Sequence, residues 1–368
     1  MYTIPSETRY GLQLAEAAYF FREIAFEVES NHATIFLYLS HPGLNILTFP
    51  EKVNCEERIK IYEALSYGDA GVLLACPGSS LSGFLIDQIG SAEQKKYFYQ
   101  QLEAQPMRTF LAVTEPLHGS NLATMQTQFS IKKESSMGEL NGEKWLISHG
   151  ATGGMGVVIV KTGEGPLCKR ALLLTPQCLQ KTQYIQKKLL SMSGLTGACL
   201  SQMLFKNCPV EREWLLGNHV NYFEHGMMAL LKTFNQMRPC VGAMAIGVAQ
   251  AALDYYCDIK KTNHTHSENQ LISLQCSIDI ARNILCQAAR YIDKNPLDGS
   301  LSSLAKSHAT KTAEYVVTSI CDMLNQHEIL FHPHLMKWYR DIWGFEYMEG
   351  TSNIHKINAF NAYKKMAG

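Results

Sequence analysis

A carboxylate near the end of the chain has the surroundings expected of a catalytic base. Glu349 stands in the segment Tyr-Met-Glu-Gly-Thr-Ser-Asn at 347–353, and a helical pattern continues from Asn353 to Met366. Backbone N–H groups and the helix dipole favour negative charge at such an N-terminus. The segment alone leaves two interpretations open. Glu349 accepts a proton, or it only enters the helix while Thr351 or Ser352 provides the N-cap.

A second segment could bind a planar polar ring. Residues 111–121 read Leu-Ala-Val-Thr-Glu-Pro-Leu-His-Gly-Ser-Asn, which predicts a strand that ends in a polar turn. The N–H and C=O groups along its edge are free to bind such a ring, and Thr114 adds a hydroxyl. The alternative is an ordinary strand-to-loop turn closed by Pro116 and Gly119.

Two further segments carry polar groups that could join the same site. Residues 142–150 read Gly-Glu-Lys-Trp-Leu-Ile-Ser-His-Gly and predict either a site strand that carries Ser148 or an ordinary core strand. Residues 234–239 read Phe-Asn-Gln-Met-Arg-Pro, where Arg238 could support an active-site carboxylate or remain on the surface. Pro239 should kink the surrounding helical zone or mark its true start.

The composition is that of an ordinary soluble protein. Of the 368 residues, 46% are hydrophobic and 18% charged, and the net charge at pH 7 is zero. This balance argues against nucleic acid and anionic membranes as partners. The 11 cysteines form no C-x-x-C pairs, which favours reduced thiols, a cytoplasmic location and no metal site. No signal pattern opens the chain and no apolar run reaches about 18 residues, so we expect no membrane insertion.

Three zones of different periodicity follow one another. Apolar residues recur three or four apart up to about Gln105, short β-type runs follow to about Gly217, and helical stripes return from about Glu224. The pattern predicts an α+β fold with segregated layers and without βαβ alternation. We expect an N-terminal all-α domain at 1–108, a middle β domain at 109–222 and a C-terminal helical bundle at 223–368.

The three polar segments and their order along the chain resemble the acyl-CoA dehydrogenase family. The family carries Tyr-Glu-Gly-Thr with a catalytic glutamate, Val-Thr-Glu-Pro-x-x-Gly-Ser-Asp on its flavin strand, and Gly-x-Lys-x-Trp-Ile-Thr-Asn. Arg340 and Asp341 stand where it has Arg-Asp. The resemblance covers nearly the whole chain. It implies a middle β-barrel-like domain, a C-terminal four-helix bundle and FAD as the cofactor.

The resemblance also assigns roles to individual residues. Glu349 would remove the α-proton of an acyl thioester, and its backbone N–H would help to polarise the thioester carbonyl. The implied FAD contacts are Leu111, Val113, Thr114, Ser120, Leu146, Ile147, Ser148, Thr351 and Asn353. The implied substrate contacts are Ser120, Asn235, Arg238 and Gly350.

Several positions depart from the family pattern. Leu117 and Asn121 replace a glycine and an aspartate, and Leu146 stands where many members have a tryptophan beside the flavin ring. Trp145, one residue earlier, should face the other side of a regular strand. Either the shielding aromatic is missing or the local register differs.

Two segments that hold FAD across subunits in the family are also changed. Lys260–His264 replaces Arg-x-Thr-Phe-Gly, and Leu324–His327 replaces Gly-Gly-x-Gly, where bulky side chains would block close backbone approach. Pro77 follows the Leu73-Leu74 pair where the family lines its acyl pocket, which predicts a short or irregular pocket.

The matches predict an FAD-dependent acyl-thioester dehydrogenase, in which a hydride passes from the β carbon to flavin N5 as Glu349 takes the α-proton. One alternative is a flavoenzyme that oxidises a small polar acyl group on a carrier protein in secondary metabolism. Others are an oxidase or monooxygenase of the same fold, and a paralogue without FAD that serves as a binding subunit.

The expected partners are an acyl thioester of CoA or of an acyl carrier protein, an unidentified electron acceptor and further copies of the chain in a homodimer or homotetramer. Pro77 and the Leu73-Leu74 pair favour a short acyl group. A modestly basic rim favours a carrier-bound one, because complementary charge raises encounter rates with an acidic carrier protein. Its members are Lys260, Lys261, His264 and His266.

Overall fold

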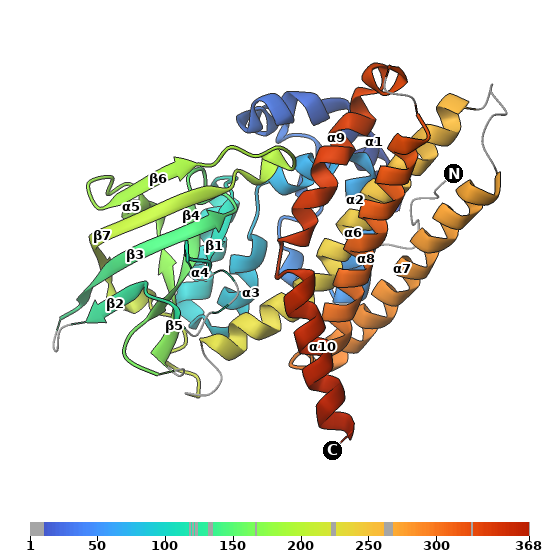
Figure 1. Ribbon diagram of the computed structural model, residues 1–368. Coiled ribbons are helices and arrows are strands. Elements are labelled where there is room, and N and C mark those ends of the chain that lie inside the picture. Colours follow the sequence, from blue (N-terminus) through green and yellow to red (C-terminus); the bar gives the residue numbers. More distant parts are fainter. Residues whose placement is uncertain are drawn as a thin grey trace.

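Helices make up both ends of the chain and strands its middle, which confirms the predicted α+β fold (Figure 1). The computed structural model describes residues 11–117, 119, 121, 124–131, 135–165, 168–221, 226–260, 268–324 and 327–367. The N-terminal helices are α1 (Leu12–Ser30), α2 (Cys55–Ala75), α3 (Ser80–Ile89) and α4 (Ala92–Ala104). The later helices are α5 (Pro176–Leu179), α6 (Met227–Lys260), α7 (Glu268–Lys294), α8 (Ser300–Asp322), α9 (Pro333–Asp341) and α10 (Ser352–Ala367).

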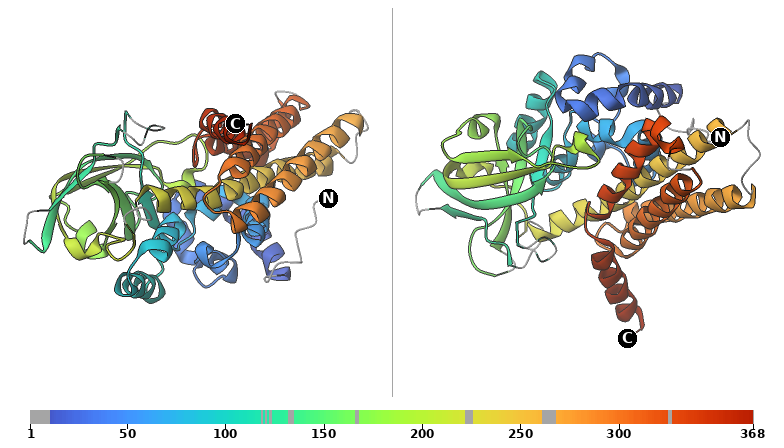
Figure 2. Two further views of the ribbon diagram at one scale, coloured as in Figure 1. Left: turned by 90° about the horizontal axis from the view of Figure 1, so that it is seen from below. Right: turned by 45° about the horizontal axis from the view of Figure 1, so that its top comes forward.

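The strands form one curled sheet, which the left view of Figure 2 shows end-on. They are β1 (Thr109–Ala112), β2 (Gln128–Ile131), β3 (Met137–Ile147), β4 (Met155–Lys161), β5 (Lys169–Leu174), β6 (Ile185–Leu189) and β7 (Ser201–Glu211). The order is β1-β4-β2-β3-β7-β6, with β5 paired to β4. The β1–β4 and β2–β4 pairs are parallel and the other pairs are antiparallel.

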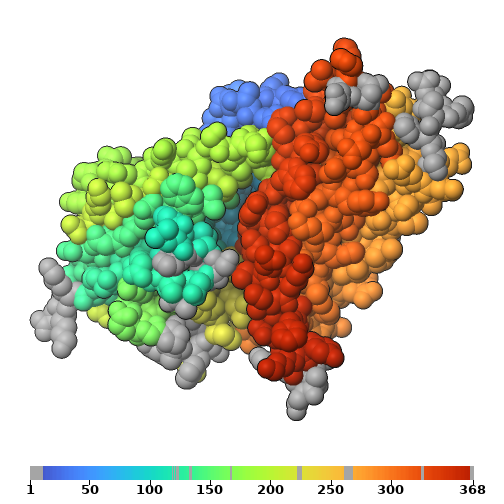
Figure 3. All heavy atoms as spheres, viewed as in Figure 1, coloured from blue at the N-terminus to red at the C-terminus, as the bar shows by residue number. Residues whose placement is uncertain are grey.

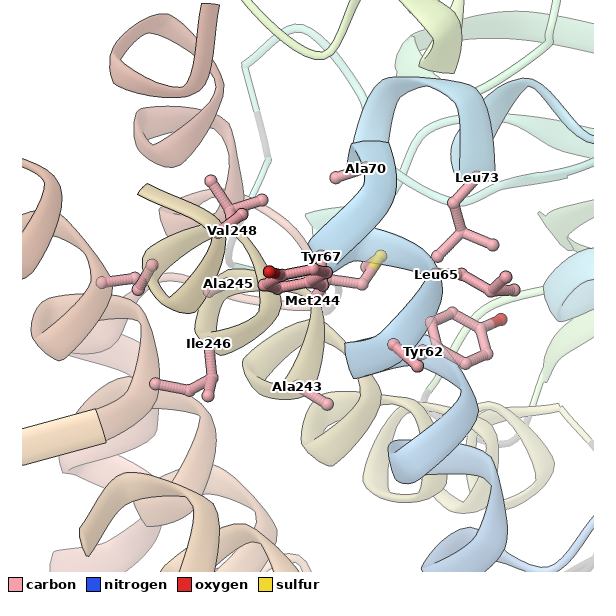
Figure 4. Packing of buried hydrophobic residues seen from close by; sticks show 14 of the residues in the cluster. Tyr62, Leu65, Tyr67, Ala70, Leu73, Ala243, Met244, Ala245, Ile246 and Val248 are labelled. Atoms are coloured by element: carbon pink, nitrogen blue, oxygen red, sulfur yellow. The ribbon is translucent and has the colours of Figure 1, made fainter. Parts of the chain in front are cut away.

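The main core lies between α2 and the long C-terminal helices, so the N-terminal region completes the bundle. Tyr67 of α2 and Met244 of α6 lie between these two helices, while Leu65 and Leu73 point to the side of α2 away from α6 (Figure 4). Gly247 permits the close approach, because a Cβ there would lie 2.3 Å from the Glu63 carbonyl oxygen. Bulkier residues at 247 would push the helices apart.

Helix α6 runs unbroken through Pro239, so the expectation that this proline marks the helix start is wrong. The helix already begins at Met227. Its length and apolar composition would suffice to cross a membrane, but 89% of its most apolar window is buried inside the molecule. We therefore describe α6 as a core helix.

A buried charged cluster connects α2, α9 and the sheet domain. Helix α2 breaks at Asp69, whose backbone is extended (φ −160°, ψ 122°). The Lys337 ammonium on α9 lies 2.7 Å from carboxylates of both Asp69 and Asp341. Asp341 also accepts a 2.7 Å hydrogen bond from the backbone N–H of Leu195, in the loop before β7. The cluster fixes the sheet domain against the helices that carry the candidate base.

Candidate active site

The segment that carries Glu349 is a left-handed turn between a short 3-10 helix, η9 (Ile342–Glu346), and α10. Glu349 has φ of 54° and Gly350 has φ of 106°. A non-glycine residue at positive φ is uncommon and persists only where the surroundings impose it. Two buried cations provide those surroundings. Arg238 Nε donates to the Glu349 carbonyl at 3.3 Å, and Lys306 Nζ donates to the carbonyls of Glu346 and Gly350 at 2.9 and 2.8 Å.

The start of α10 is capped by a carboxylate from outside the helix. Glu346 accepts hydrogen bonds from the Ser352 backbone N–H at 2.8 Å and from the Ser352 hydroxyl at 2.6 Å. Of the two residues expected at the N-cap, Thr351 holds that position, since α10 begins at Ser352 and the Thr351 carbonyl accepts from the His355 N–H at 3.0 Å. Ser352 instead donates its hydroxyl to Glu346. This arrangement lowers the pKa of Glu346, mainly through the Ser352 hydrogen bonds and against the effect of burial.

The carboxyl of Glu349 is left without a partner. Within the described part of the chain it has no hydrogen bond or ion pair, and its backbone N–H has no acceptor. Burial raises the pKa of Glu349 to about 7, although the charges of Arg238 and Lys306 oppose the rise. A base whose pKa lies near the operating pH transfers protons most effectively.

The other acidic candidates are committed to structural contacts. Glu115 accepts hydrogen bonds from the backbone N–H groups of Gln126 and Thr127 at 2.7 and 2.9 Å, and it pairs with the buried Lys144 at 3.0 Å. Glu346 caps α10. Of these carboxylates, Glu349 is the one free to take a proton from a ligand.

The two predicted flavin segments lie side by side. The backbone N–H of Trp145 donates to the Thr114 carbonyl at 2.9 Å, and Lys144 Nζ donates to the Val113 carbonyl at 2.9 Å. These bonds join the end of β1 to the end of β3, although about thirty residues separate them along the chain. Two predicted polar groups, the Thr114 and Ser148 hydroxyls, therefore come from neighbouring segments.

The end of β3 is irregular, and the irregularity decides which side chain faces outward. The pairing with β7 shifts between Lys144 and Ile147, and Leu146 between them has φ of 58°. The Leu146 side chain is 49% exposed, whereas Ile147 is buried. The sequence left two alternatives, a missing shielding aromatic or a changed strand register. The register does shift here, and the outward position is held by the aliphatic Leu146.

The remaining predicted contacts are placed as follows. Leu111 and Val113 lie on and just after β1, and Asn235 and Arg238 are buried on α6, where Arg238 donates to the Asn235 side chain at 2.7 Å. Thr351 and Asn353 flank the start of α10, next to the base. Ser120 lies outside the described residues.

A hollow separates the sheet domain from the C-terminal helices in the space-filling view (Figure 3). The red C-terminal segments form one wall and the green sheet domain the other, with blue N-terminal atoms recessed at its floor. Glu349 belongs to the C-terminal segment, between η9 and α10. The Thr114 and Ser148 hydroxyls lie on neighbouring segments of the sheet domain and can donate hydrogen bonds to a polar ring, so the residues present fit a flavin.

The structure also describes residues at three of the departures from the family pattern. Lys260 pairs with Glu328 and is largely covered, so it offers little charge to a basic rim, and Lys261, His264 and His266 lie outside the described residues. Leu324 is buried against the helical core, and Asn325 and Gln326 also lie outside the described residues. Pro77 is buried just after α2, which ends at Ala75.

Lys144 is expected to be needed for stability, because its partner Glu115 would otherwise be a buried charge without a counter-ion. The variant Lys144→Met should lower the free energy of unfolding by about 3–5 kcal/mol, measured by urea denaturation. The matched control Lys161→Met breaks a pair whose Glu164 is 95% exposed and should cost less than about 1 kcal/mol. Equal losses in the two variants would contradict this account of the β1–β3 junction.

Comparisons with known protein families show to which family the chain belongs. The chain matches the acyl-CoA dehydrogenase middle domain at residues 111–208 and the acyl-CoA dehydrogenase C-terminal domain at residues 224–362. The chain belongs to the acyl-CoA dehydrogenase family. It is therefore an oxidoreductase of the acyl-thioester dehydrogenase type, as its sequence motifs predicted.

Individual relatives are similar to the chain in sequence, and several solved structures share its fold. The chain is 25% identical to the acryloyl-CoA reductase (NADH) of Anaerotignum propionicum, over 91% of this chain and 88% of the relative. The butyryl-CoA dehydrogenase structure from Megasphaera elsdenii has a TM-score of 0.83 at 22% identity, covering 99% and 100% of the two chains. A prolyl acyl carrier protein oxidase structure has a TM-score of 0.79 at 16% identity, covering 96% and 98%. Solved structures with this fold include complexes with FADH2 and with FAD.

Sequence reasoning missed several residues that build the site. Lys306 on α8 donates to two carbonyls of the turn, and His355 on α10 packs beside Gly350. The charge of Glu349 also acts on Tyr62 of α2. Each lies within a helical pattern, and nothing in the local sequence distinguishes it from an ordinary helix residue. Only the tertiary structure brings them to the base.

Proposed function

We propose that the chain is an FAD-dependent acyl-thioester dehydrogenase with Glu349 as its base. The observation that carries the proposal is the unpartnered Glu349 carboxyl on a turn held by Arg238 and Lys306, with a pKa of about 7. A thioester bound in the hollow would present its α carbon to this carboxylate. The free backbone N–H of Glu349 would donate to the thioester carbonyl and favour the charge that develops there.

The flavin would be held by the sheet domain. Thr114 and Ser148 would donate hydroxyl hydrogen bonds, and Leu146 would cover one face of the ring. When bound, FAD would accept the hydride that leaves the β carbon. The chain itself contributes orientation, a desolvated carboxylate and exclusion of water.

The reverse direction is a second candidate. The acryloyl-CoA reductase relative favours it, and a carboxyl with a pKa of about 7 can donate a proton as readily as it accepts one. Glu349 would then give its proton to the α carbon of an unsaturated thioester.

Substrate and direction can be tested together. The purified protein, loaded with FAD, would be mixed anaerobically with butyryl-CoA, octanoyl-CoA and a short acyl group on a carrier protein, and flavin absorbance followed. We propose fastest bleaching by the short thioesters, since Leu73 and Pro77 suggest a shallow pocket. In the reverse assay, prereduced protein would be mixed with crotonyl-CoA. No absorbance change with any saturated or unsaturated thioester would contradict the proposed function.

A carrier-bound substrate remains part of the proposal, although its supporting rim is weaker because Lys260 pairs with Glu328. The prolyl acyl carrier protein oxidase shows that the fold can host such a reaction in another protein. Equal bleaching by matched CoA and carrier thioesters, unchanged by added salt, would contradict the carrier preference.

We also propose that the protein is a cytoplasmic homo-oligomer that passes its electrons to a separate acceptor. Apolar side chains exposed on the C-terminal helices support self-association: Leu304 on α8 is 48% exposed and Phe360 on α10 is 64% exposed. Sedimentation at micromolar concentration should give a dimer or tetramer, and a monomer would contradict the proposal.

Flavin binding is expected to depend on Leu146. The variant Leu146→Glu should weaken FAD binding, because it would place a charge against the ring, while Leu146→Trp should tighten binding by about 2- to 10-fold through stacking. Isothermal calorimetry of the apoprotein with FAD measures both effects. The control Leu37→Trp alters another exposed leucine, far along the chain, and should change nothing. Unchanged binding in Leu146→Glu would place the flavin elsewhere.

A further inference from the structure

Lys306 is a fully buried lysine without a carboxylate partner in the described part of the chain. It lies on α8 with no exposed surface, and its ammonium donates to two backbone carbonyls, those of Glu346 at 2.9 Å and Gly350 at 2.8 Å. A buried ammonium is costly unless it is hydrogen-bonded or paired. The two hydrogen bonds to those carbonyls therefore offset the cost of burying the Lys306 ammonium.

The two carbonyls are the two ends of the turn that carries the base. Glu346 ends η9, and Gly350 precedes α10 by two positions. Between them Glu349 holds positive φ, and Gly350 does so as well. A single ammonium that binds both ends closes the turn in the way a crosslink would, so it opposes relaxation of Glu349 to ordinary backbone angles.

The other groups around the turn have different roles. Arg238 on α6 donates through Nε to the Glu349 carbonyl of the turn. Its Nη1 donates to the side chains of Asn235 and Ser303. Burial chiefly raises the pKa of Tyr62 on α2, and the charge of Glu349 adds a smaller part. His355 on α10 is fully buried beside Gly350, and burial lowers its pKa to about 3, so it stays neutral.

We propose that Lys306 is a positioning residue for the base, acting by clamping both ends of the 346–350 turn and by keeping a positive charge near the Glu349 carboxylate. This inference rests on the proposed function in so far as Glu349 is the base. The clamp fixes where the carboxylate points. The charge favours the ionised carboxylate, which is the form that accepts a proton.

The clamp predicts two separate effects of Lys306→Met. Methionine is similar to lysine in length but has neither its charge nor its hydrogen-bond donors. The first is a fall of about 100-fold in flavin reduction by the best thioester, because small displacements of a catalytic group have effects of that size. The second is an upward shift of the pH midpoint of that rate, since loss of a nearby positive charge raises the pKa of a carboxyl. A merely structural role would lower the rate without moving the midpoint.

Lys311→Met is the matched control. Lys311 lies on the same helix, is 53% exposed and pairs chiefly with Glu314, although the Glu346 carboxylate lies 3.6 Å away. It touches none of the carbonyls of the turn. The control should leave the pH midpoint in place, and a shift as large as that of Lys306→Met would overturn the proposal.

A stability measurement tests the same coupling without any reaction. The change Glu349→Gln would be made in the wild-type and Lys306→Met backgrounds, and urea midpoints compared at about pH 4 and about pH 8. The clamp predicts that, at the higher pH, Glu349→Gln raises the urea midpoint more in the Lys306→Met background than in the wild-type background. At the lower pH, Glu349→Gln should change the urea midpoint equally in the two backgrounds. Equal gains at both pH values would overturn the proposal.

Lys306→Gln would be measured in the same cycle, so that the test survives if the methionine variant fails to fold. The two questions remain distinguishable. Wild-type protein that ignores every thioester but shows the coupling would defeat the proposed function and support the clamp. Wild-type protein that reduces its flavin, with no coupling and no shifted midpoint in either Lys306 variant, would overturn the clamp and leave the function standing.

Discussion

The variant Glu349→Gln is expected to fold and to bind FAD, yet to lose most thioester oxidation. Glutamine is nearly isosteric with glutamate but cannot accept the α-proton, and removal of a general base costs on the order of 10² to 10⁴ in rate. The loss should appear in flavin reduction during single turnover, before any electron acceptor takes part.

The contacts of the other acidic residues make Glu349→Gln a sharp test of Glu349 as the base. Glu115 and Glu346 are held by Lys144 and Ser352, so neither is free to replace the missing base. A surface control, Glu164→Gln, alters a side chain that is 95% exposed and should keep full activity. Flavin reduction at the wild-type rate in Glu349→Gln would show that the base is another group.

The same substitution is expected to stabilise the fold at neutral and alkaline pH. Burial raises the pKa of Glu349 from 4.5 to about 7, so the folded protein holds this proton where the unfolded chain has released it. The wild-type protein therefore loses stability as the pH rises from about 4.5 to about 7, and the loss is complete above that range. Glutamine has no such proton to lose.

The expected advantage of Glu349→Gln is therefore absent below about pH 4.5 and grows to at most about 3 kcal/mol above about pH 7. Urea denaturation across this pH range measures it, with Glu164→Gln as the exposed control. A constant difference at all pH values, or an advantage that appears only in acid, would contradict the raised pKa of this half-buried, unpartnered carboxyl.

Much of the fold could be predicted because its elements carry strong local patterns. Helix α7 buries Leu274, Ile278 and Leu285 along one face, as the three-four spacing indicates. Ser91 caps α4 in a capping box with Gln94, a serine followed three residues later by glutamine, which is a typical signal of a helix start. Strands β2 and β6 carry little local signal, because their residues are mostly polar or exposed, as in Ile-Gln-Lys-Lys-Leu of β6. They form through pairing with β3 and β7.

The site could be predicted only in its local parts. Glu349 stands beside a recognisable turn, and Thr114 stands at the end of an apolar strand, so each carries a signal in its own neighbourhood. The bulge that turns Leu146 outward depends on a register shift against β7, which single-strand alternation does not reveal. The sequence around Lys306 does not indicate that this lysine is buried, because its burial depends on the distant 346–350 turn, whose carbonyls it binds.

The central claim is that Glu349 takes the α-proton of a thioester, and hydrogen exchange at that carbon tests it most directly. The FAD-loaded protein would be incubated anaerobically with the best thioester of the panel in D2O, and deuterium at the α carbon measured by mass spectrometry. The account predicts that wild-type protein introduces deuterium at the α carbon and that Glu349→Gln, although it still binds FAD, does not. Exchange in Glu349→Gln at the wild-type rate would contradict the account.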